Sequence, residues 1–258
     1  MPKRRIEDEI ERLGQNPTPA ALKKALSDRV GLLVAKAAKL VAEHQLRDLI
    51  PDLLAAFERL LENPVERDPQ CWGKNAIAKA LTSLDYRDSA LYLRGSRHVQ
   101  MEPVWAGQED TAPALRGICL LGLVTCSDIR REVVLRRLVD AVMDPAQTVR
   151  IEAARALGEM AGDESPLLLR LKALAGDREP PVVGQVFDGL LRLEGPGAIQ
   201  FIAGFFQGQA HAAFYEAQVQ MLRGFEGLIE TVAQHGQTIH TVNASAHATD
   251  LSSTNLFT

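Results

Sequence analysis

Seven side chains of this sequence have the types and spacing that suit binding of an acidic partner. Lysine and arginine recur at helical spacing within Ala-rich segments, and a tryptophan lies in a polar stretch between two of these segments. Basic side chains pair with carboxylates, and tryptophan beside arginine is a combination enriched at binding hot spots. We therefore expect an acidic protein segment to bind at a set of candidate residues. They are Lys36, Lys39, Lys79, Trp105, Arg116, Arg150 and Arg155.

Catalytic and cofactor chemistry has no comparable set of residues. The sequence contains no G-x-S-x-G motif and no glycine-rich phosphate loop, and no cysteine has a histidine at a plausible position. The spacing of His235, His240 and His247 fits neither an H-E-x-x-H motif nor a zinc finger. We therefore expect no catalytic site, no metal site and no cofactor, and a binding role rather than that of a self-contained enzyme.

Charge and composition limit which classes of partner the protein is expected to bind and in which compartment of the cell it is expected. The chain has 29 basic and 33 acidic side chains and a net charge of -4, so no overall field attracts phosphate backbones or anionic membranes. Aromatic residues make up only 5%, and the apolar residues are mainly Ala and Leu, which favours closely packed helices. No stretch is long and apolar enough to span a membrane, and the beginning lacks the apolar core of a signal peptide. These features predict a cytoplasmic protein with reduced cysteines, no membrane partner and no nucleic-acid partner.

A repeated Ala-rich pattern indicates the elements that position the basic residues. Between Val149 and Met160 apolar residues recur on one helical face, with Leu157 as its anchor. Equivalent anchors occur at Val41, Leu81, Leu123 and Leu190, at intervals of 40, 42, 34 and 33 residues, and a weaker copy follows from His211 to Leu222. Alanine at the contacts allows neighbouring helix pairs to stack closely.

The pattern predicts an all-α solenoid, or superhelix, of about six helix pairs over residues 18–236. Residues 1–17 form an N-terminal extension of possible helical structure, and 237–258, rich in Thr, Ser, Asn and His, are expected to be a disordered tail. Two longer connections, Glu62–Gln70 and Glu102–Pro113, are expected to be loops on one side of the solenoid. The second contains Trp105.

One repeat resembles the HEAT-like repeat of the phycobilisome-lyase type. The resemblance depends on Asp144, Val149-Arg150, Ala153-Ala154 and Ala156-Leu157-Gly158. It implies that the aspartate before the second helix and the arginine on that helix tie neighbouring repeats together. Asp177 repeats the aspartate, but Val183 occupies the place of the next arginine, so we expect the ladder to be interrupted there.

The resemblance leaves three functions open. The favoured one is a protein–protein interaction scaffold or adaptor that binds through the concave face built by the second helices. A resemblance to bilin-lyase subunits implies a lyase or chaperone-like subunit acting on a bulky cofactor. HEAT-like DNA glycosylases combine a basic groove with tryptophan and a carboxylate, and Trp72, Trp105, Asp110 and Arg116 offer these types, although the balanced charge argues against phosphate binding. The di-iron hydroxylases of similar fold require His-Glu dipeptides, which this sequence lacks.

Deletion of residues 237–258 is expected to leave the fold intact, because this segment supplies no periodic apolar face. The melting temperature of the shortened chain should lie within about 2 °C of that of the full chain. Limited proteolysis of the full chain should cut this segment first. Cleavage elsewhere while the segment survives would contradict the expectation.

Overall fold

The computed structural model describes residues 6–205 of the 258-residue chain. These residues are mainly helical, which confirms the all-α class, with a single β-hairpin as the exception among them. The repeat expected near His211 and the tail expected over 237–258 lie outside the described residues. The chain divides into two compact units, residues 1–198 and 199–258, and the helices discussed below belong to the first, except for α13, most of which belongs to the second.

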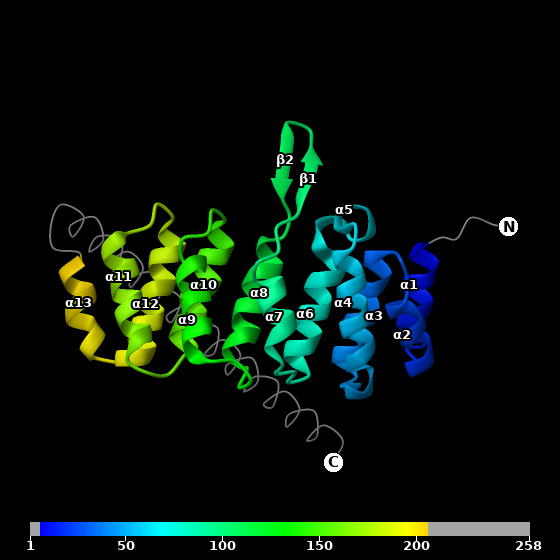
Figure 1. Ribbon diagram of the computed structural model, residues 1–258, viewed down its shortest axis with the longest axis horizontal. Helices are drawn as coiled ribbons and strands as arrows, with labels where there is room; N and C mark the ends of the chain where they lie inside the picture. The colour runs from blue at the N-terminus through cyan, green and yellow to red at the C-terminus, as the bar shows by residue number, and fades with distance from the viewer. Residues whose placement is uncertain (1–5, 206–258) are drawn as a thin grey trace, which may run out of the picture. The chain divides into compact units, whose positions relative to one another are not determined.

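The helices of the first unit alternate between two sets, shown in Figure 1. The first helix of each pair is α2 (Pro19–Leu26), α4 (Ile50–Leu61), α7 (Ser89–Gly95), α9 (Arg131–Ala141) or α11 (Glu164–Ala175). The second helix is α3 (Gly31–Glu43), α6 (Trp72–Ser83), α8 (Pro113–Val124), α10 (Gln147–Glu159) or α12 (Pro180–Glu194). The remaining helical segments are α1 (Ile6–Gln15), α5 (Pro64–Arg67), α13 (Gly197–Phe205) and the short 3-10 turns η1 (Arg47–Leu49) and η2 (Pro69–Cys71).

The second helices lie side by side in chain order, because α3 packs on α6, α6 on α8, α8 on α10, and α10 on α12. Each of them also packs against the first helix of its own pair, and α1 packs against α3. The five anchor residues of the sequence pattern are completely buried in these second helices. Periodic apolar residues therefore form one continuous core, to which each pair contributes a layer.

Close approach of α10 and α12 depends on two glycines. A Cβ atom placed on Gly158 would lie 2.9 Å from the Cα atom of Gly189, which is closer than such atoms approach in proteins. A side chain at Gly158 would push the two helices apart, and a Cβ atom at Gly189 would lie 2.9 Å from the side chain of Leu169 of α11.

An aspartate lies before each second helix, and the five recur at the intervals of the anchors: Asp28, Asp68, Asp110, Asp144 and Asp177. In four of them the carboxylate accepts a hydrogen bond from the backbone N–H two residues later, at 2.9–3.0 Å. Asp68 instead accepts from the N–H groups of Gly73 and Lys74. Each aspartate therefore fixes the chain where it enters the second helix.

In three of the pairs a basic residue of the second helix lies six positions after the aspartate: Lys74, Arg116 and Arg150. The ammonium of Lys74 lies 2.9 Å from Asp68, and both side chains are fully buried. Arg116 joins Asp110 of its own pair, at 2.7 Å, to Asp144 of the next pair, at 3.0 Å. These bonds set the register between neighbouring pairs as well as within one pair.

Val183 leaves α12 without the basic residue found on α6, α8 and α10, as expected, and the carboxylate before α12 is met by cations from two other helices. Arg150 of α10 reaches forward to Asp177, with an Nε–Oδ2 distance of 2.8 Å. Lys172, from the first helix α11, approaches the same carboxylate with its Nζ at 2.8 Å. The missing basic residue on α12 is therefore replaced by one from α11, because two nearby cations compensate the buried carboxylate.

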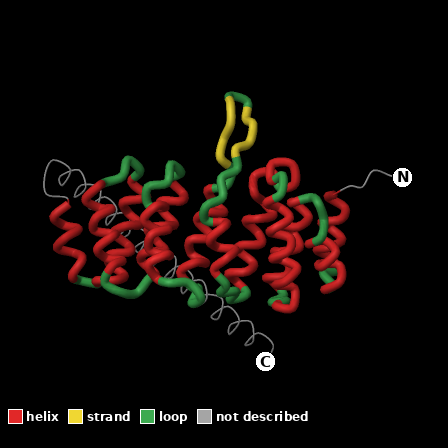
Figure 2. Tube along the Cα trace, in the orientation of Figure 1, coloured by secondary structure: helices red, strands yellow, loops and turns green. Residues whose placement is uncertain are grey.

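The loop expected over Glu102–Pro113 is in fact mostly a β-hairpin. Strand β1 (Met101–Val104) pairs antiparallel with β2 (Gly107–Asp110), and Val104 faces Gly107 in the register. The connection is thus a two-residue turn, Trp105–Ala106, followed by Gly107 at a φ of +133° that favours glycine. Figure 2 shows the hairpin in yellow, standing out from the helices on either side of it.

Substitution Leu157→Asp is expected to destabilise the first unit by more than the roughly 3 kcal/mol of a truncation to alanine, because it buries an unpaired charge. Leu157 is completely buried in the last turn of α10. Leu174→Asp is the matched control, since Leu174 is exposed on α11. Urea unfolding of both variants tests the assignment, and equal stabilities would contradict it.

Candidate binding surface

A groove follows the exposed faces of the second helices α3, α6, α8 and α10. Its first part, of about 910 Å³, lies along α3 and α6, and its second part, of about 540 Å³, continues over α8 and α10. Lys79 and Ser83 line both parts, so the two are continuous at the end of α6. The groove therefore extends over the second helices of four successive pairs.

The surface of the groove is apolar. Leu32 is 42% exposed and Trp72 is 47% exposed, and both line its first part. Ile118 and Leu121 of α8 line its second part. Exposed apolar side chains that gather in a concave site, rather than scattered singly, are typical of binding surfaces.

Four of the candidate basic residues are brought together by the groove. Lys36, Lys39 and Lys79 line its first part, and Lys79 and Arg155 line its second part. Lys39 lies 3.7 Å from Glu43, and Arg155 lies 3.1 Å from Glu152. Within residues 6–205 no carboxylate comes within ion-pair distance of Lys36 or Lys79. The groove therefore combines exposed apolar side chains with two ammonium groups, those of Lys36 and Lys79, that have no carboxylate partner in this part of the chain, while Glu43 and Glu152 also line it.

Two other candidates, Arg116 and Arg150, lie elsewhere, and their assignment to an exposed binding face is wrong. Arg116 is 3% exposed and Arg150 is 7% exposed, because both belong to the aspartate ladder. Arg150 also donates to the backbone carbonyl oxygens of Asp144 and Pro145, at 2.9 and 3.0 Å. Their guanidinium groups have carboxylate and carbonyl partners inside the protein and stabilise the stacking of the helix pairs.

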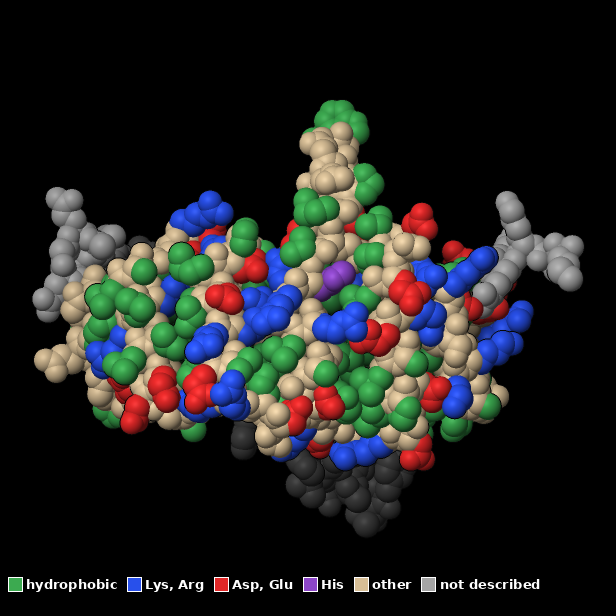
Figure 3. Space-filling model, viewed as in Figure 1, with side chains coloured by type: hydrophobic (Ala, Val, Ile, Leu, Met, Phe, Trp, Pro, Cys, Tyr) green, Lys and Arg blue, Asp and Glu red, His purple; other side chains and the backbone are tan. Residues whose placement is uncertain are grey.

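Trp105 is fully exposed at the tip of the hairpin, as Figure 3 shows by the hydrophobic atoms at the end of a narrow projection. The expected pairing of this indole with Arg116 does not occur, because the guanidinium lies buried at the base of the hairpin, 2.7 Å from Asp110. Elsewhere on the face seen in Figure 3, acidic and basic side chains are interspersed. The hairpin tip and the groove are thus two separate candidate surfaces.

Trp72, named above only for the glycosylase alternative, is half-exposed and lines the groove. It stands 40 residues after Leu32, at the same position of its repeat, and both side chains face the groove. The repeat register was a signal for this position, because equivalent residues of stacked pairs share a face. Tryptophan at such a position supplies a large aromatic contact area.

The cysteines of the described part of the chain lack the properties of a nucleophile. Burial raises the pKa of Cys71 to about 11, and burial also raises that of Cys126 to about 11. Cys119 is completely buried, which raises its pKa as well. Because thiolates rather than thiols react, these side chains are unreactive at neutral pH. Within residues 6–205 no three His, Cys, Asp or Glu side chains are grouped so that they could hold a metal ion.

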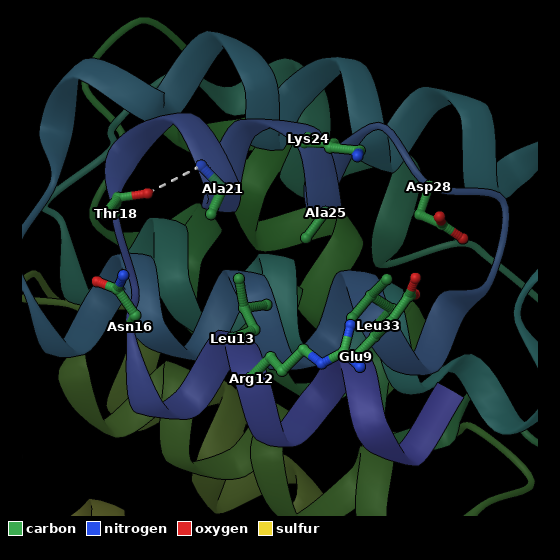
Figure 4. Close-up of a pocket in the computed structure, with 10 residues that line it drawn as sticks. All are labelled: Glu9, Arg12, Leu13, Asn16, Thr18, Ala21, Lys24, Ala25, Asp28 and Leu33. Atoms are coloured by element: carbon green, nitrogen blue, oxygen red, sulfur yellow. Dashed lines mark hydrogen bonds between the residues drawn. The ribbon is translucent and has the colours of Figure 1, made fainter. Parts of the chain in front are cut away.

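A smaller cleft, of about 380 Å³, lies beside α1 and α2 at the first helix pair (Figure 4). Its lining combines Leu13 with acidic Glu9 and Asp28 and basic Arg12 and Lys24. Charges of both signs alternate around it, so it has no preference for a partner of one charge. Among residues 6–205, no helix combines the length and the apolar character that a membrane span requires.

Comparison with known proteins finds a partial similarity. A stretch of 53 residues, 20% of the chain, is 51% identical to the ESAT-6-like protein EsxC of Mycolicibacterium paratuberculosis and 49% identical to EsxC of two Mycobacterium tuberculosis strains, CDC 1551 / Oshkosh and H37Rv. The match covers 56% of those proteins, so the chain spans just over half the length of the curated relatives it matches. No known family profile matches the chain.

The ladder predicts how stability depends on pH. Burial alone would raise the pKa of Asp177, but hydrogen bonds from Arg150 and Lys172 outweigh it and hold this pKa well below its usual range. A carboxyl group whose pKa is lower in the folded state contributes stability above its unfolded pKa of about 3.9 and loses it as the pH falls toward the folded pKa.

Asp177→Asn should therefore lower the free energy of unfolding at pH 7 by about 3 kcal/mol, because it leaves buried cations uncompensated. The difference from the parent chain should shrink as the pH falls below about 4, because the unfolded parent then takes up a proton at Asp177 whereas the folded parent keeps this carboxylate ionised. Urea unfolding of the variant and the parent at pH 7, 5 and 3 measures this difference in the free energy of unfolding. Asp163→Asn, at an exposed carboxylate, is the control, and a difference that stays constant over this pH range would contradict the role of Asp177.

Proposed function

We propose that this protein is an interaction scaffold or adaptor, built as a HEAT-like α-solenoid, and that its groove over the second helices binds an acidic segment of another protein. The observation that carries the proposal is the continuous groove with apolar walls and basic borders on four successive second helices. A partner that lies along the row would contact the same kind of surface on each pair.

The solenoid interpretation is supported by the order of packing and by the ladder. Each second helix packs on the second helices before and after it, and an aspartate recurs before each of them at intervals of 33 to 42 residues. Pairs that contact only their neighbours are the defining property of a helical repeat array. The groove on α3, α6, α8 and α10 is then the concave face of the array.

The chemistry of the groove favours an amphipathic acidic partner. The apolar side chains of Leu32, Trp72 and Ile118 suit leucine or a similar residue on one face of a helix. The ammonium groups of Lys36 and Lys79 suit carboxylates on its flanks. An entirely polar partner would leave the apolar walls in water, and a basic partner would be repelled.

Asn75 adds a polar contact point to the first part of the groove. Its side-chain oxygen is buried and has no hydrogen-bond donor within residues 6–205, although the residue itself lines the groove. An unsatisfied buried acceptor costs roughly 1–3 kcal/mol. Because this oxygen is buried, a donor on a bound segment would reach it only after the Asn75 side chain turned toward the groove.

The proposed scaffold works in the cytoplasm and uses no cofactor, as the sequence indicates. The lyase-like and glycosylase-like alternatives predict other ligands for the same groove. Co-purification of a coloured tetrapyrrole would favour the first, and salt-sensitive binding of duplex DNA would favour the second. Acidic-segment binding is preferred because the groove joins apolar walls to isolated ammonium groups of Lys36 and Lys79.

A synthetic amphipathic helix, with leucine on one face and glutamate on its flanks, tests the proposal. We expect the full chain to bind it, and Lys36→Glu with Lys79→Glu to weaken binding at least about tenfold, or about 1.4 kcal/mol. Fluorescence anisotropy of the labelled peptide measures the dissociation constant. Affinity should also fall with added salt, because the rim charges are exposed to solvent.

Lys24→Glu with Arg178→Glu is the matched control, because both side chains are exposed outside the groove and the net charge changes equally. A peptide in which lysine replaces glutamate should bind only weakly. The proposal fails if the two double variants bind the acidic peptide equally well, or if the lysine peptide binds as tightly as the acidic one.

A further inference from the structure

The hairpin presents an apolar tip that nothing in the described part of the chain covers. Val104, Trp105 and Ala106 form its end and are exposed, and Val99 and Met101 are exposed along its side. A lone exposed hydrophobic residue is common, but an indole held fully in solvent beside two further exposed apolar residues, Val104 and Ala106, is not. Such a tip has the properties of an anchor for a hydrophobic pocket.

The base of the hairpin is held in place by buried polar groups. The backbone N–H of Gln100 donates to Asp110 at 3.1 Å, and its side-chain amide donates to the carbonyl of Asp68 at 2.9 Å. Thr111 donates to the carboxylate of Glu102 at 2.6 Å. Because Asp68 and Asp110 are also members of the ladder, the hairpin is fixed to the helix pairs. Its tip is therefore presented in a defined orientation, which reduces the entropy lost on binding.

The charge of the hairpin limits what the tip can bind. From Val99 to Ala112 there is no lysine or arginine, and Glu109 is an exposed carboxylate on β2, opposite Glu102 and nearer the base than the tip. Nucleic acids and anionic lipid surfaces attract basic side chains and repel carboxylates. The suitable receptor is a protein groove with apolar and aromatic walls and a basic border.

The groove of this same protein has those properties. Trp72 offers an aromatic wall, and the ammonium groups of Lys36 and Lys79 suit both the carboxylate of Glu109 and the face of an indole. We propose that the hairpin tip of one copy, with Trp105 as its anchor, docks into the groove of a second copy along α3 and α6. This inference rests on the proposed function, because it names an occupant of the same groove.

A second molecule is required by the position of the tip. Trp105 is fully exposed in the chain as described, and Figure 1 shows the hairpin extending away from the helices rather than lying along them. Each copy has one tip and one groove, so two reciprocal contacts complete a dimer with two-fold symmetry. In such a dimer the grooves are occupied, and an acidic partner segment has to displace the tips. Self-association would thus regulate access to the scaffold.

Sedimentation velocity of the full chain over a range of concentrations tests the proposal. We expect reversible association, weakened at least about tenfold by Trp105→Ala and likewise by Lys36→Glu with Lys79→Glu. Leu174→Ala and the Lys24→Glu with Arg178→Glu pair, which change exposed residues elsewhere, should associate as the parent does. Glu109→Lys alone should weaken association. Combined with Lys36→Glu and Lys79→Glu, the same substitution should restore association, because the charges on the two surfaces are then exchanged.

Two further measurements locate the contact. The sequence has two tryptophans, Trp72 and Trp105, and their emission should shift to the blue as the parent associates, whereas Trp105→Ala should show no such shift. The acidic peptide used above should dissociate the parent dimer. A mixture of the Trp105→Ala and groove variants should associate more strongly than either variant alone, because one tip and one intact groove can still meet.

A parent chain that remains monomeric at about 100 µM, or that associates equally well after Trp105→Ala, would overturn the proposal. Association that needs Trp105 but survives Lys36→Glu with Lys79→Glu would overturn it as well, because the receptor would then lie outside the groove. Peptide binding that depends on Lys36 and Lys79 would leave the proposed function standing in each of these cases. Failure of the peptide test alone would count against the proposed function.

Discussion

The ladder of buried aspartates and cations is the interaction on which the rest of the first unit depends. Each carboxylate holds a backbone N–H at the start of a second helix, and most also meet a cation on that helix, on the preceding pair or on the adjoining first helix. A charge buried without its partner is strongly destabilising. The ladder therefore admits one register between neighbouring pairs, and the apolar anchors pack in that register.

The ladder also determines which basic side chains remain for binding. On α10, Arg150 precedes the anchor Leu157 by seven residues, whereas Arg155 precedes it by two. Five residues turn an α-helix by about 140°, so the two guanidinium groups point to different sides. The same separation holds on α6 between buried Lys74 and exposed Lys79. One side of each second helix thus stabilises the stack, and another side forms the groove.

The hairpin connects the aspartate ladder to an exposed apolar tip. Its base shares Asp110 with the ladder, while its tip carries Trp105 into solvent. A two-stranded hairpin alone is marginally stable in water, and the buried hydrogen bonds of Gln100 and Glu102 supply what it lacks. Rigidity at the base and exposure at the tip are therefore consequences of the same polar network.

The sequence by itself determined the helical class, the buried anchors and the approximate limits of the helices, because apolar periodicity and helix-start signals are local properties. It also placed Lys39, Lys79 and Arg155 at equivalent positions, two residues before the anchors of their helices. Only the tertiary structure decided that Arg116 and Arg150 are buried, that Lys172 replaces the cation missing at Val183, and that Trp72 faces outward. It likewise decided that Trp105 ends a hairpin. The reason is that burial and pairing depend on side chains brought together from helices 25 to 40 residues apart in sequence, and no local pattern specifies which of two arginines on one helix meets a carboxylate of the next pair.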